Sequence, residues 1–322
     1  MAEIALSFVI PVRNDAVRLG RCLDTIVAGI GGRDDVEIIV ADNGSTDDSA
    51  ATARARGATV LPLPGLRLGA LRNTAAAAAR GRILAFVDAD HEIVLEWIPA
   101  AIEALASPRV GGVGAPCHPP TPGTWVQRLY DRLRRHPTRQ EPVEWLGSGN
   151  MAVRRAAFEA VGGFDTSLET CEDVDLCRKL RGRGYDLLAD HRMRNVHHGD
   201  PRTLGDVFFG ELWRGRDNIR VSLRPPTSGR TLVSAAIPLA NLLAVIAIAV
   251  GLLSLSTTGL WLALAAALFL LALVTMRAAV MLGAANVGDW PGALAVAAAY
   301  EAGRACAIAG RFSYRRRRTA IA

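Results

Sequence analysis

Two carboxylates that could bind a metal ion follow directly after a short apolar run. Asp88 and Asp90 come after the run RILAFV, where a buried strand would end. Carboxylates two residues apart bring hard oxygen ligands to one spot, which suits Mg²⁺ or Mn²⁺. A divalent ion there could bridge the diphosphate of a nucleotide and offset the charge on a departing phosphate. An isolated Asp-x-Asp pair is a weak signal because aspartate is common in loops, but the position after a strand, 46 residues beyond Asp42, strengthens it.

A second acidic stretch, Glu172-Asp173-Val174-Asp175, offers a group for acid–base chemistry. One of its carboxylates could face a cleft and take a proton from an acceptor hydroxyl. A nearby cation would keep such a carboxylate ionised, as a base must be. The alternative is helix capping, since acidic side chains at a helix start are stabilised by the helix dipole.

Two further stretches place polar groups after apolar runs. In residues 10–14, IPVRN, the proline is expected to end a strand. Asp42 follows the run EIIVA, Gly44 allows a tight turn, and Thr46 or Asp47 can cap the next helix. Taken alone, the Asp42 stretch is more typical of a plain strand–turn–helix connection than of a binding site.

The segments that would position these side chains alternate between strand and helix patterns over the first 225 residues. The predicted strands are residues 5–10, 37–41, 58–63 and 83–88, and the predicted helices are 16–28, 47–56 and 70–79. Short apolar runs between amphipathic helices indicate an α/β domain with a mostly parallel sheet. Such sheets bind ligands beyond the carboxyl ends of their strands, which is where the polar stretches lie.

The second part of the chain carries two long uncharged segments, residues 232–256 and 259–276. Half of the 322 residues are hydrophobic, which excludes a disordered chain, and the length fits about two domains. Twenty-five residues form a helix of about 37 Å, longer than the roughly 30 Å hydrocarbon core of a bilayer. The sequence therefore predicts a transmembrane hairpin. The alternative is a buried helical hairpin of a large soluble protein.

The net charge of +6 is better explained by a membrane than by a nucleic-acid partner. Arginines flank the hairpin on both sides, which places both flanks in the cytoplasm. Five of them lie in the basic tail: Arg311, Arg315, Arg316, Arg317 and Arg318. A helix over residues 290–310 is interrupted by Glu301 and Arg304, so we expect it to lie at the interface. The five cysteines include no Cys-x-x-Cys pair and indicate a reducing compartment.

The motifs together resemble the family-2 inverting glycosyltransferases of the GT-A fold. The resemblance covers roughly residues 5–220 and depends on four separated motifs in the right order, which are SFVIPVRND, IIVADNGSTDDS, ALRNTAAAAARGRILAFVDAD and GSGN with its continuation to CEDVDLC. It implies a GT-A domain over residues 1–225, with a mostly parallel sheet flanked by helices, followed by an α-helical membrane domain over 226–322. Many membrane-attached members are similar in having a hairpin there.

The resemblance also implies which residues bind the nucleotide sugar. They are Pro11, Val12, Asp42, Arg72, Asn73, Asp88, Gly149 and Asn150. Pro11 and Val12 would line the base pocket, and Asp42 would hydrogen-bond the base. Arg72 and Asn73 would belong to the segment that closes over the nucleotide, and Asp88 would contact the ribose side or the metal. Gly149 and Asn150 would touch the donor sugar and the acceptor.

The same resemblance assigns the reacting groups. Asp173 would be the catalytic base, and Glu172 would hold the acceptor. Asp90 would bind Mg²⁺ or Mn²⁺ directly, with Asp88, and His197 would complete the metal or diphosphate site. For His197 the alternative is a solvated histidine in a turn, since VHHGDP is typical of a loop. His91 and His191 are expected to be bystanders.

We expect a membrane-anchored glycosyltransferase that uses a nucleotide diphosphate sugar, with UDP favoured, and a lipid-linked or saccharide acceptor. We expect a multi-pass protein of the inner (plasma) membrane whose catalytic domain lies in the cytoplasm. The expected process is cell envelope polysaccharide synthesis. The QxxRW motif of processive synthases is replaced by ELWRGR at residues 211–216, which argues against long-chain polymerisation.

Three alternatives stand beside this expectation. A polyprenyl-phosphate sugar synthase would need no base. A nucleotidyltransferase would open with a glycine-rich loop, whereas no glycine follows Ile10 until Gly20. A catalytically silent membrane scaffold would be marked by the loss of a key carboxylate, and none of the expected ones is missing.

Overall fold

The computed structural model describes residues 3–225, 227–283 and 287–309. The chain forms two compact units. The first comprises Met1–Pro122 and Arg134–Asp200, and the second Gly123–Leu133 and Pro201–Ala322. These units divide after Pro122, Leu133 and Asp200. The predicted domain boundary between residues 225 and 226 stays a prediction.

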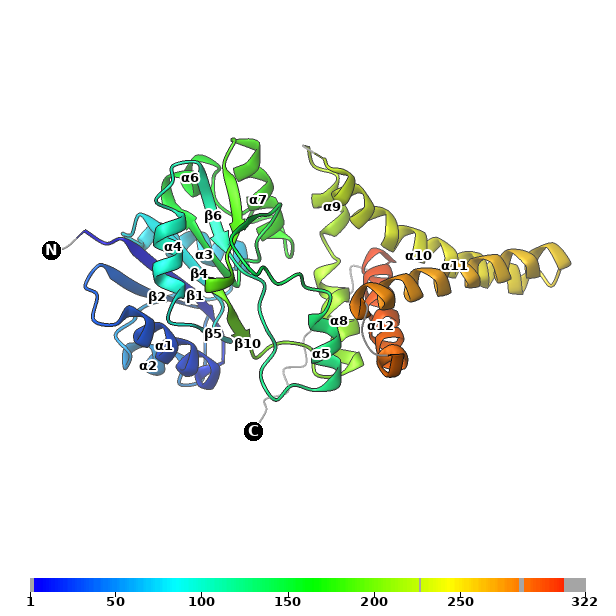
Figure 1. Cartoon of the computed structure of the whole chain (residues 1–322), viewed down its shortest axis with the longest axis horizontal. Helices are drawn as coiled ribbons and strands as arrows, with labels where there is room; N and C mark the ends of the chain where they lie inside the picture. The colour runs from blue at the N-terminus through cyan, green and yellow to red at the C-terminus, as the bar shows by residue number, and fades with distance from the viewer. Residues whose placement is uncertain (1–2, 226, 284–286, 310–322) are drawn as a thin grey trace. The chain divides into compact units, whose positions relative to one another are not determined.

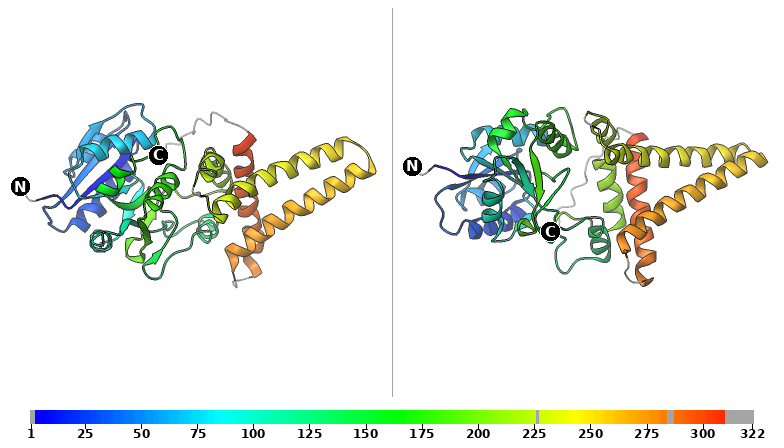
Figure 2. Two further views of the ribbon diagram at one scale, coloured as in Figure 1. Left: turned by 90° about the horizontal axis from the view of Figure 1, so that it is seen from above. Right: turned by 45° about the horizontal axis from the view of Figure 1, so that its top comes forward.

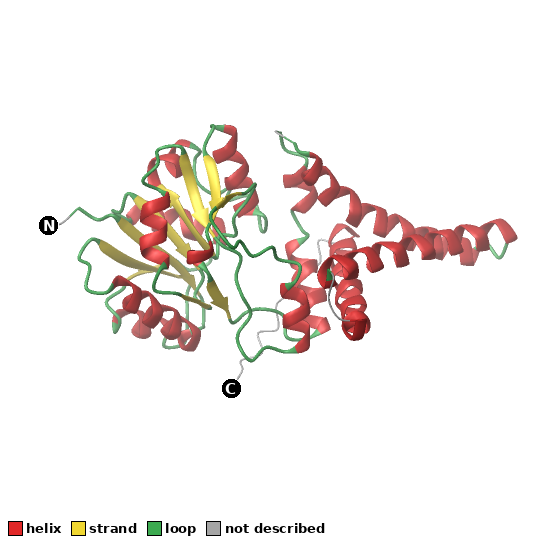
Figure 3. Ribbon diagram, in the orientation of Figure 1, coloured by secondary structure: helices red, strands yellow, loops and turns green. Residues whose placement is uncertain are grey.

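A mostly parallel sheet forms the centre of the first unit, as predicted (Figure 1 and Figure 3). Within the described residues its strand order is β3-β2-β1-β4-β8-β6-β9-β7. Strand β8 runs antiparallel to both neighbours, β7 is antiparallel to β9, and the remaining pairs are parallel. The strands are β1 (Leu6–Val12), β2 (Val36–Asp42), β3 (Thr59–Pro62), β4 (Ile83–Val87), β6 (Val110–Gly114), β7 (Glu141–Pro142), β8 (Asn150–Arg154) and β9 (Asp186–Ala189).

Helices cover both faces of this sheet, because side chains alternate along each strand. On β1, Leu6, Phe8 and Ile10 belong to one apolar cluster and Val9 to the other. Helices α1 and α4 contribute to the first cluster, and α3, α6 and α7 to the second. The helices are α1 (Ala16–Ile30), α2 (Ser49–Arg54), α3 (Leu68–Ala78), α4 (Trp97–Ala104), α6 (Arg155–Ala160) and α7 (Glu172–Gly182), with a 3-10 turn at His191–Met193.

The predicted strands and helices are confirmed, with ends that differ by at most two residues. One expectation at residues 10–14 is wrong: Pro11 does not end the strand, since β1 continues to Val12. Pairing explains why proline is tolerated there. Strand β1 pairs with β4 only as far as Val9, so Pro11 has a strand on one side alone, facing Ala41 of β2.

A small second sheet lies beside the carboxyl end of β4. Strand β5 (His91–Ile93) pairs antiparallel with β10 (Asn195–His197), which places His91 opposite His197. The chain therefore returns to the Asp-x-Asp segment a hundred residues later. Nothing in the local pattern of these short segments indicates this pairing.

The second unit is helical within its described residues. The two uncharged segments are helical, as predicted, and form a hairpin of α10 (Gly229–Leu253) and α11 (Thr257–Leu282), which lie side by side (Figure 2). Both helices are long and apolar enough to cross a membrane. At the turn the backbones approach closely, since a Cβ on Gly251 would lie 2.4 Å from the carbonyl oxygen of Gly259.

Shorter helices pack around the base of the hairpin. They are α5 (Trp125–Asp131), α8 (Leu204–Arg214), α9 (Asn218–Ser222) and α12 (Trp290–Ala309), with a 3-10 turn at Val287–Asp289. The predicted helix over 290–310 is α12, and its location at a membrane interface stays a prediction. Gly310 and the arginine tail, which carries the expected topology signal, lie outside the described residues.

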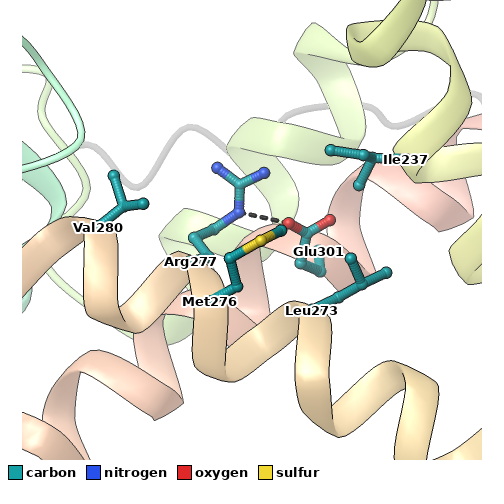
Figure 4. A pocket seen from close by; sticks show the side chains of 6 residues that line it. All are labelled: Ile237, Leu273, Met276, Arg277, Val280 and Glu301. Carbon is teal, nitrogen blue, oxygen red and sulfur yellow. Dashed lines mark hydrogen bonds and ion pairs between the residues drawn. The ribbon is translucent and has the colours of Figure 1, made fainter.

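Polar side chains at the base of the hairpin are paired. A pocket of about 140 Å³ lies among α10, α11 and α12, and Figure 4 shows Arg277 and Glu301 paired within its apolar walls. Asn241 of α10 donates a second hydrogen bond to Glu301, 2.7 Å long. The buried carboxylate of Glu301 is therefore paired with both a guanidinium and an amide, as a buried charge requires.

Candidate active site

The Asp-x-Asp segment lies where β4 ends, as predicted. His197 brings Nε2 to 3.4 Å from Asp90 Oδ2, and His91 Nε2 lies 3.8 Å from Asp90 Oδ1. Arg18 of α1 adds a guanidinium nitrogen 3.6 Å from Asp90 Oδ2. Burial would raise the pKa of Asp90, but the charge of His197 and its hydrogen bond outweigh burial and hold that pKa well below its usual range.

His197 is held from its other side by a carboxylate. Its Nδ1 lies 2.7 Å from Asp200 Oδ1, and Arg134 donates to both oxygens of Asp200 at 2.6 Å. Burial lowers the pKa of His197, but Asp90 and Asp200 together raise it to about 10. The bond from Nδ1 leaves Nε2 facing Asp90, which is the arrangement of a histidine ready to bind a metal.

His91 lies beside this group, and its prediction as a bystander stays a prediction. It is buried, and its ring packs edge-to-face on that of His197 with centroids 4.4 Å apart. Burial and the charge of His197 lower the pKa of His91 to about 4. His191 starts a 3-10 turn, and its Nδ1 lies 3.5 Å from Asp190 Oδ1.

Two glycines lie so close to these groups that a Cβ would not fit. A Cβ on Gly199 would lie 2.3 Å from Asp90 Oδ2 and 2.6 Å from His197 Nε2. A Cβ on Gly149 would lie 2.8 Å from Asp88 Oδ2. A side chain at either position would displace these groups, and oxygen and nitrogen donors of this kind suit Mg²⁺ or Mn²⁺.

Arg72 of α3 is a buried ion-pair centre. Its side chain is 1% exposed, and its two terminal nitrogens bond Asp88 Oδ1 at 2.6 Å and Glu172 Oε1 at 2.8 Å. The guanidinium also lies 5.6 Å from the centroid of the Phe164 ring. Arg72 therefore connects the Asp-x-Asp segment to the acidic start of α7, two stretches that are 84 residues apart in sequence.

The acidic stretch at residues 172–175 begins helix α7. Asp173 accepts hydrogen bonds from its neighbour Val174 N at 2.8 Å and from Ser148 N at 3.3 Å. Ser148 Oγ also lies 3.3 Å from Glu172 Oε1, so the GSGN segment is joined to the helix start. Burial and the charge of Glu172 raise the pKa of Asp173 to about 7, although the backbone donors oppose this.

The predicted base-binding residues lie at the same edge of the sheet. Val12 and Asp42 are partners in the parallel pair of β1 and β2, next to Pro11. Strand β4 is the other neighbour of β1, so β1 alone separates the strand that ends at Asp42 from the strand that ends just before Asp88. Asp42 is 7% exposed and accepts a hydrogen bond from Ser45 N that closes the loop after β2.

Two predicted contact residues use their side chains inside the fold. Asn73 forms both of its hydrogen bonds with the backbone of Phe164, at 2.9 Å each. Asn150 accepts from Trp97 Nε1 and donates to two backbone carbonyls. The remaining predicted residues, Arg72, Asp88, Asp90, Gly149, Glu172, Asp173 and His197, are brought together by the contacts described above.

Sequence analysis did not find Arg134, Asp200 and Gly199 as parts of this group. Gly199 and Asp200 stand next to the predicted histidine in VHHGDP, so proximity in sequence was an available signal. Arg134 carried none, because its link to Asp200 spans 66 residues.

Comparisons with known proteins identify the first unit. Residues 7–162 match the model of Glycosyl transferase family 2. The chain is 28% identical over 246 residues to glycosyltransferase AglE of Haloferax volcanii, covering 72% of this chain and 79% of AglE. It is 32% identical over 211 residues to an N-acetylglucosaminyl-diphospho-decaprenol L-rhamnosyltransferase of Mycobacterium tuberculosis, covering 51% of this chain and 66% of the relative. The share of a curated relative's own length that the match covers falls as low as 12%, for the O-antigen biosynthesis protein RfbC of Myxococcus xanthus.

The fold has a solved counterpart. The mannosyltransferase PcManGT of Pyrobaculum calidifontis, in complex with GDP-Man and Mn²⁺, superposes with a TM-score of 0.63 at 19% identity, covering 94% of this chain and 88% of PcManGT. With the family match and the sheet described above, this likeness establishes the architecture. The chain belongs to the family 2 glycosyltransferases, and its first unit has the GT-A fold.

Proposed function

We propose that this protein transfers a sugar from a nucleotide diphosphate sugar to an acceptor hydroxyl, with inversion at the anomeric carbon and with help from a divalent cation. One observation carries the proposal. The buried guanidinium of Arg72 joins Asp88, beside the candidate cation donors, to Glu172, beside the candidate base. The groups for leaving-group stabilisation and for proton removal therefore belong to one connected site.

Asp90 and His197 would hold the cation, with Asp88 nearby. The 3.4 Å separation of Asp90 Oδ2 and His197 Nε2 supports this assignment, as does the Mn²⁺ in the PcManGT complex. When bound, Mg²⁺ or Mn²⁺ supplies positive charge that stabilises the departing diphosphate. Asp88 Oδ1 is used by Arg72, so we infer that Asp90 is the principal carboxylate ligand and Asp88 contributes through Oδ2.

Asp173 is proposed as the general base. A carboxylate with a pKa of about 7 takes a proton efficiently near neutral pH. The acceptor O–H proton passes to Asp173, and the acceptor oxygen forms a bond to the anomeric carbon. The bond from that carbon to the diphosphate oxygen breaks on the opposite side, so the configuration inverts.

Glu172 has a supporting role in this scheme. Its side chain is 7% exposed, and its Oε1 is shared by Arg72 and Ser148. It therefore fixes Arg72 and raises the pKa of Asp173. Direct contact of Glu172 with the acceptor stays a prediction.

Helices α10 and α11 are proposed to anchor the protein in the inner membrane, with the catalytic unit in the cytoplasm. Their large apolar side chains support this: Leu253 and Trp261, for example, are 81% and 67% exposed. An anchor suits an acceptor that is itself lipid-linked. The relative whose name specifies N-acetylglucosaminyl-diphospho-decaprenol supports that class of acceptor. A saccharide acceptor in cell envelope synthesis, and UDP as the nucleotide, stay predictions.

The test is label transfer by the purified full chain from radiolabelled UDP- and GDP-sugars to membrane lipid extracts, with and without EDTA. Asp173→Asn is compared with the matched control Asp175→Asn, two residues along the same helix, whose carboxylate pairs with Arg178 and Lys179. We expect Asp173→Asn alone to lose about 10²–10⁴ in rate.

Three other results of this experiment would each contradict part of the proposal. Near-parental activity of Asp173→Asn would favour the polyprenyl-phosphate sugar synthase, whose phosphate acceptor needs no base. No transfer from any donor would favour the silent scaffold. Full activity in EDTA would remove the cation from the scheme.

A further inference from the structure

A set of nitrogen and sulfur donors lies beside the carboxylates of the active site. One ligand atom each of His91, Cys117 and His197 lies within 4.8 Å of the other two. His91 is buried, and the other two are partly exposed. None of the roles proposed above uses Cys117, and the hard cations expected at Asp90 have little affinity for sulfur.

The donor types in this set are those of a thiophilic metal. Zn²⁺ is bound by cysteine sulfur and histidine nitrogen, often with three protein ligands and one open position. In a tetrahedral site with ordinary bond lengths such atoms lie roughly 3.3–3.6 Å apart. With separations of at most 4.8 Å, each pair of ligand atoms has to approach by about 1.5 Å at most, a movement that two rotating side chains can share.

Each histidine of this set is held in place through its Nδ1 atom. Asp200 binds Nδ1 of His197 at 2.7 Å, and Asn195 binds Nδ1 of His91 at 2.6 Å. These contacts leave the Nε2 atoms facing the site. The Oδ1 of Asn195 is buried and has no hydrogen-bond partner among the described residues, so rotating this amide would let it accept from His91 Nδ1 instead. Such outer partners orient histidine ligands in metal sites.

The segment that carries Cys117 is fixed to the same framework. Arg134, which clasps Asp200, also donates to the carbonyl oxygen of Cys117 at 3.0 Å. His118 N donates to Asn195 O at 2.9 Å, and His197 N donates to His118 O at 2.8 Å. The three ligand segments are therefore connected to one another by backbone hydrogen bonds, independently of any ion.

We propose that His91, Cys117 and His197 form a second metal site, selective for Zn²⁺ and other thiophilic divalent cations. Binding converts the Cys117 thiol to a thiolate and releases its proton to solvent. Because His197 is shared with the proposed Mg²⁺ or Mn²⁺ site, the two sites compete. Zn²⁺ then acts as an inhibitor of transfer, a consequence that depends on the proposed function, whereas the metal site itself does not.

The first test uses Co²⁺ as a spectroscopic substitute for Zn²⁺ on the purified full chain. We expect a thiolate-to-cobalt charge-transfer band that Zn²⁺ displaces, and that Cys117→Ser abolishes. Cys306→Ser, at the exposed cysteine of the other unit, is the control and should keep the band. A Co²⁺ spectrum without thiolate character, or an unchanged band in Cys117→Ser, overturns the proposal.

A second measurement needs no variant. Alkylation by iodoacetamide, mapped by mass spectrometry, should slow at least tenfold at Cys117 in the presence of Zn²⁺ and stay unchanged at Cys306. Equal rates at Cys117 with and without Zn²⁺ contradict the site. In transfer assays Zn²⁺ should inhibit the parent at lower concentration than Cys117→Ser. Loss of this difference with the Co²⁺ band intact would count against the shared ligand, and absence of transfer altogether against the proposed function.

Discussion

Arg72→Met tests whether one buried guanidinium holds the two halves of the active site together. The substitution keeps a long apolar side chain but removes the charge that faces Asp88 and Glu172. Glu172 is then left 7% exposed without its cation, whereas Asp88, at 34%, can turn toward water. Most of the cost therefore comes from Glu172.

The expected loss follows from what an uncompensated buried charge costs. Removing one partner of a buried ion pair destabilises a protein by about 3–5 kcal/mol. For a unit of this size, 1 kcal/mol lowers the melting temperature by about 2–4 °C. We therefore expect the melting temperature of the first unit to fall by about 6–20 °C, with loss of transfer activity.

The assay is thermal unfolding of the full chain in detergent, followed by near-ultraviolet circular dichroism. The double variant Arg72→Met/Glu172→Gln removes the orphaned charge and should recover at least half of the loss. Arg155→Met is the control, because Arg155 bonds mainly backbone carbonyls away from the site. An Arg72→Met melting point within about 2 °C of the parent, or a double variant no more stable than the single, would refute the reasoning.

Three further predictions concern the cation donors and the base. Gly199→Ala places a Cβ 2.3 Å from Asp90 Oδ2, so the affinity for Mn²⁺ should fall while the melting temperature stays unchanged. Electron paramagnetic resonance titration measures this affinity. An unchanged affinity contradicts the placement of the ion. Asp200→Asn weakens the orientation of His197 and should lower Mn²⁺ affinity by about 10–100-fold, and a loss smaller than twofold would mean that Asp200 does not position the ligand. Because the pKa of Asp173 is raised to about 7, the base is protonated at lower pH, so kcat/KM should fall about tenfold per unit below pH 7 and level off above it. Label transfer across pH 5–9 measures this profile, and a flat profile would exclude Asp173 as the group that titrates.

Local patterns were enough to predict the sheet edge where the chemistry lies. The apolar run before Asp88 ends a strand within that run, and the turn residues after Asp42 shape only the next few residues. Each effect is local, so it is visible in the sequence. The strand ends were accordingly predicted to within two residues. Pro11 was mistaken for a strand end because the usual exclusion of proline applies only where both neighbours pair with the strand.

Pairings between distant segments could not be predicted in this way. The bond from Arg72 to Glu172 spans 100 residues, and the pairing of His91 with His197 spans 106. Arg72 was assigned to the segment that closes over the nucleotide, and only the packing of α3 against α7 shows its side chain in the interior. Asn150 illustrates the same limit, because its motif is clear but its amide is used within the fold.

The charges of the site are compensated by the chain itself, and this has a consequence for how the donor binds. Arg72 lies between Asp88 and Glu172, and His197 Nε2 lies 3.4 Å from Asp90 Oδ2. The unit can therefore hold these three acidic groups close together before any ligand arrives. The proposed divalent cation would use the same carboxylate oxygen and ring nitrogen, so it would have to replace the contact between Asp90 Oδ2 and His197 Nε2. The two ion pairs of Arg72 use neither of these atoms, so they would keep Asp88 and Glu172 in a fixed relation while the proposed cation binds at Asp90.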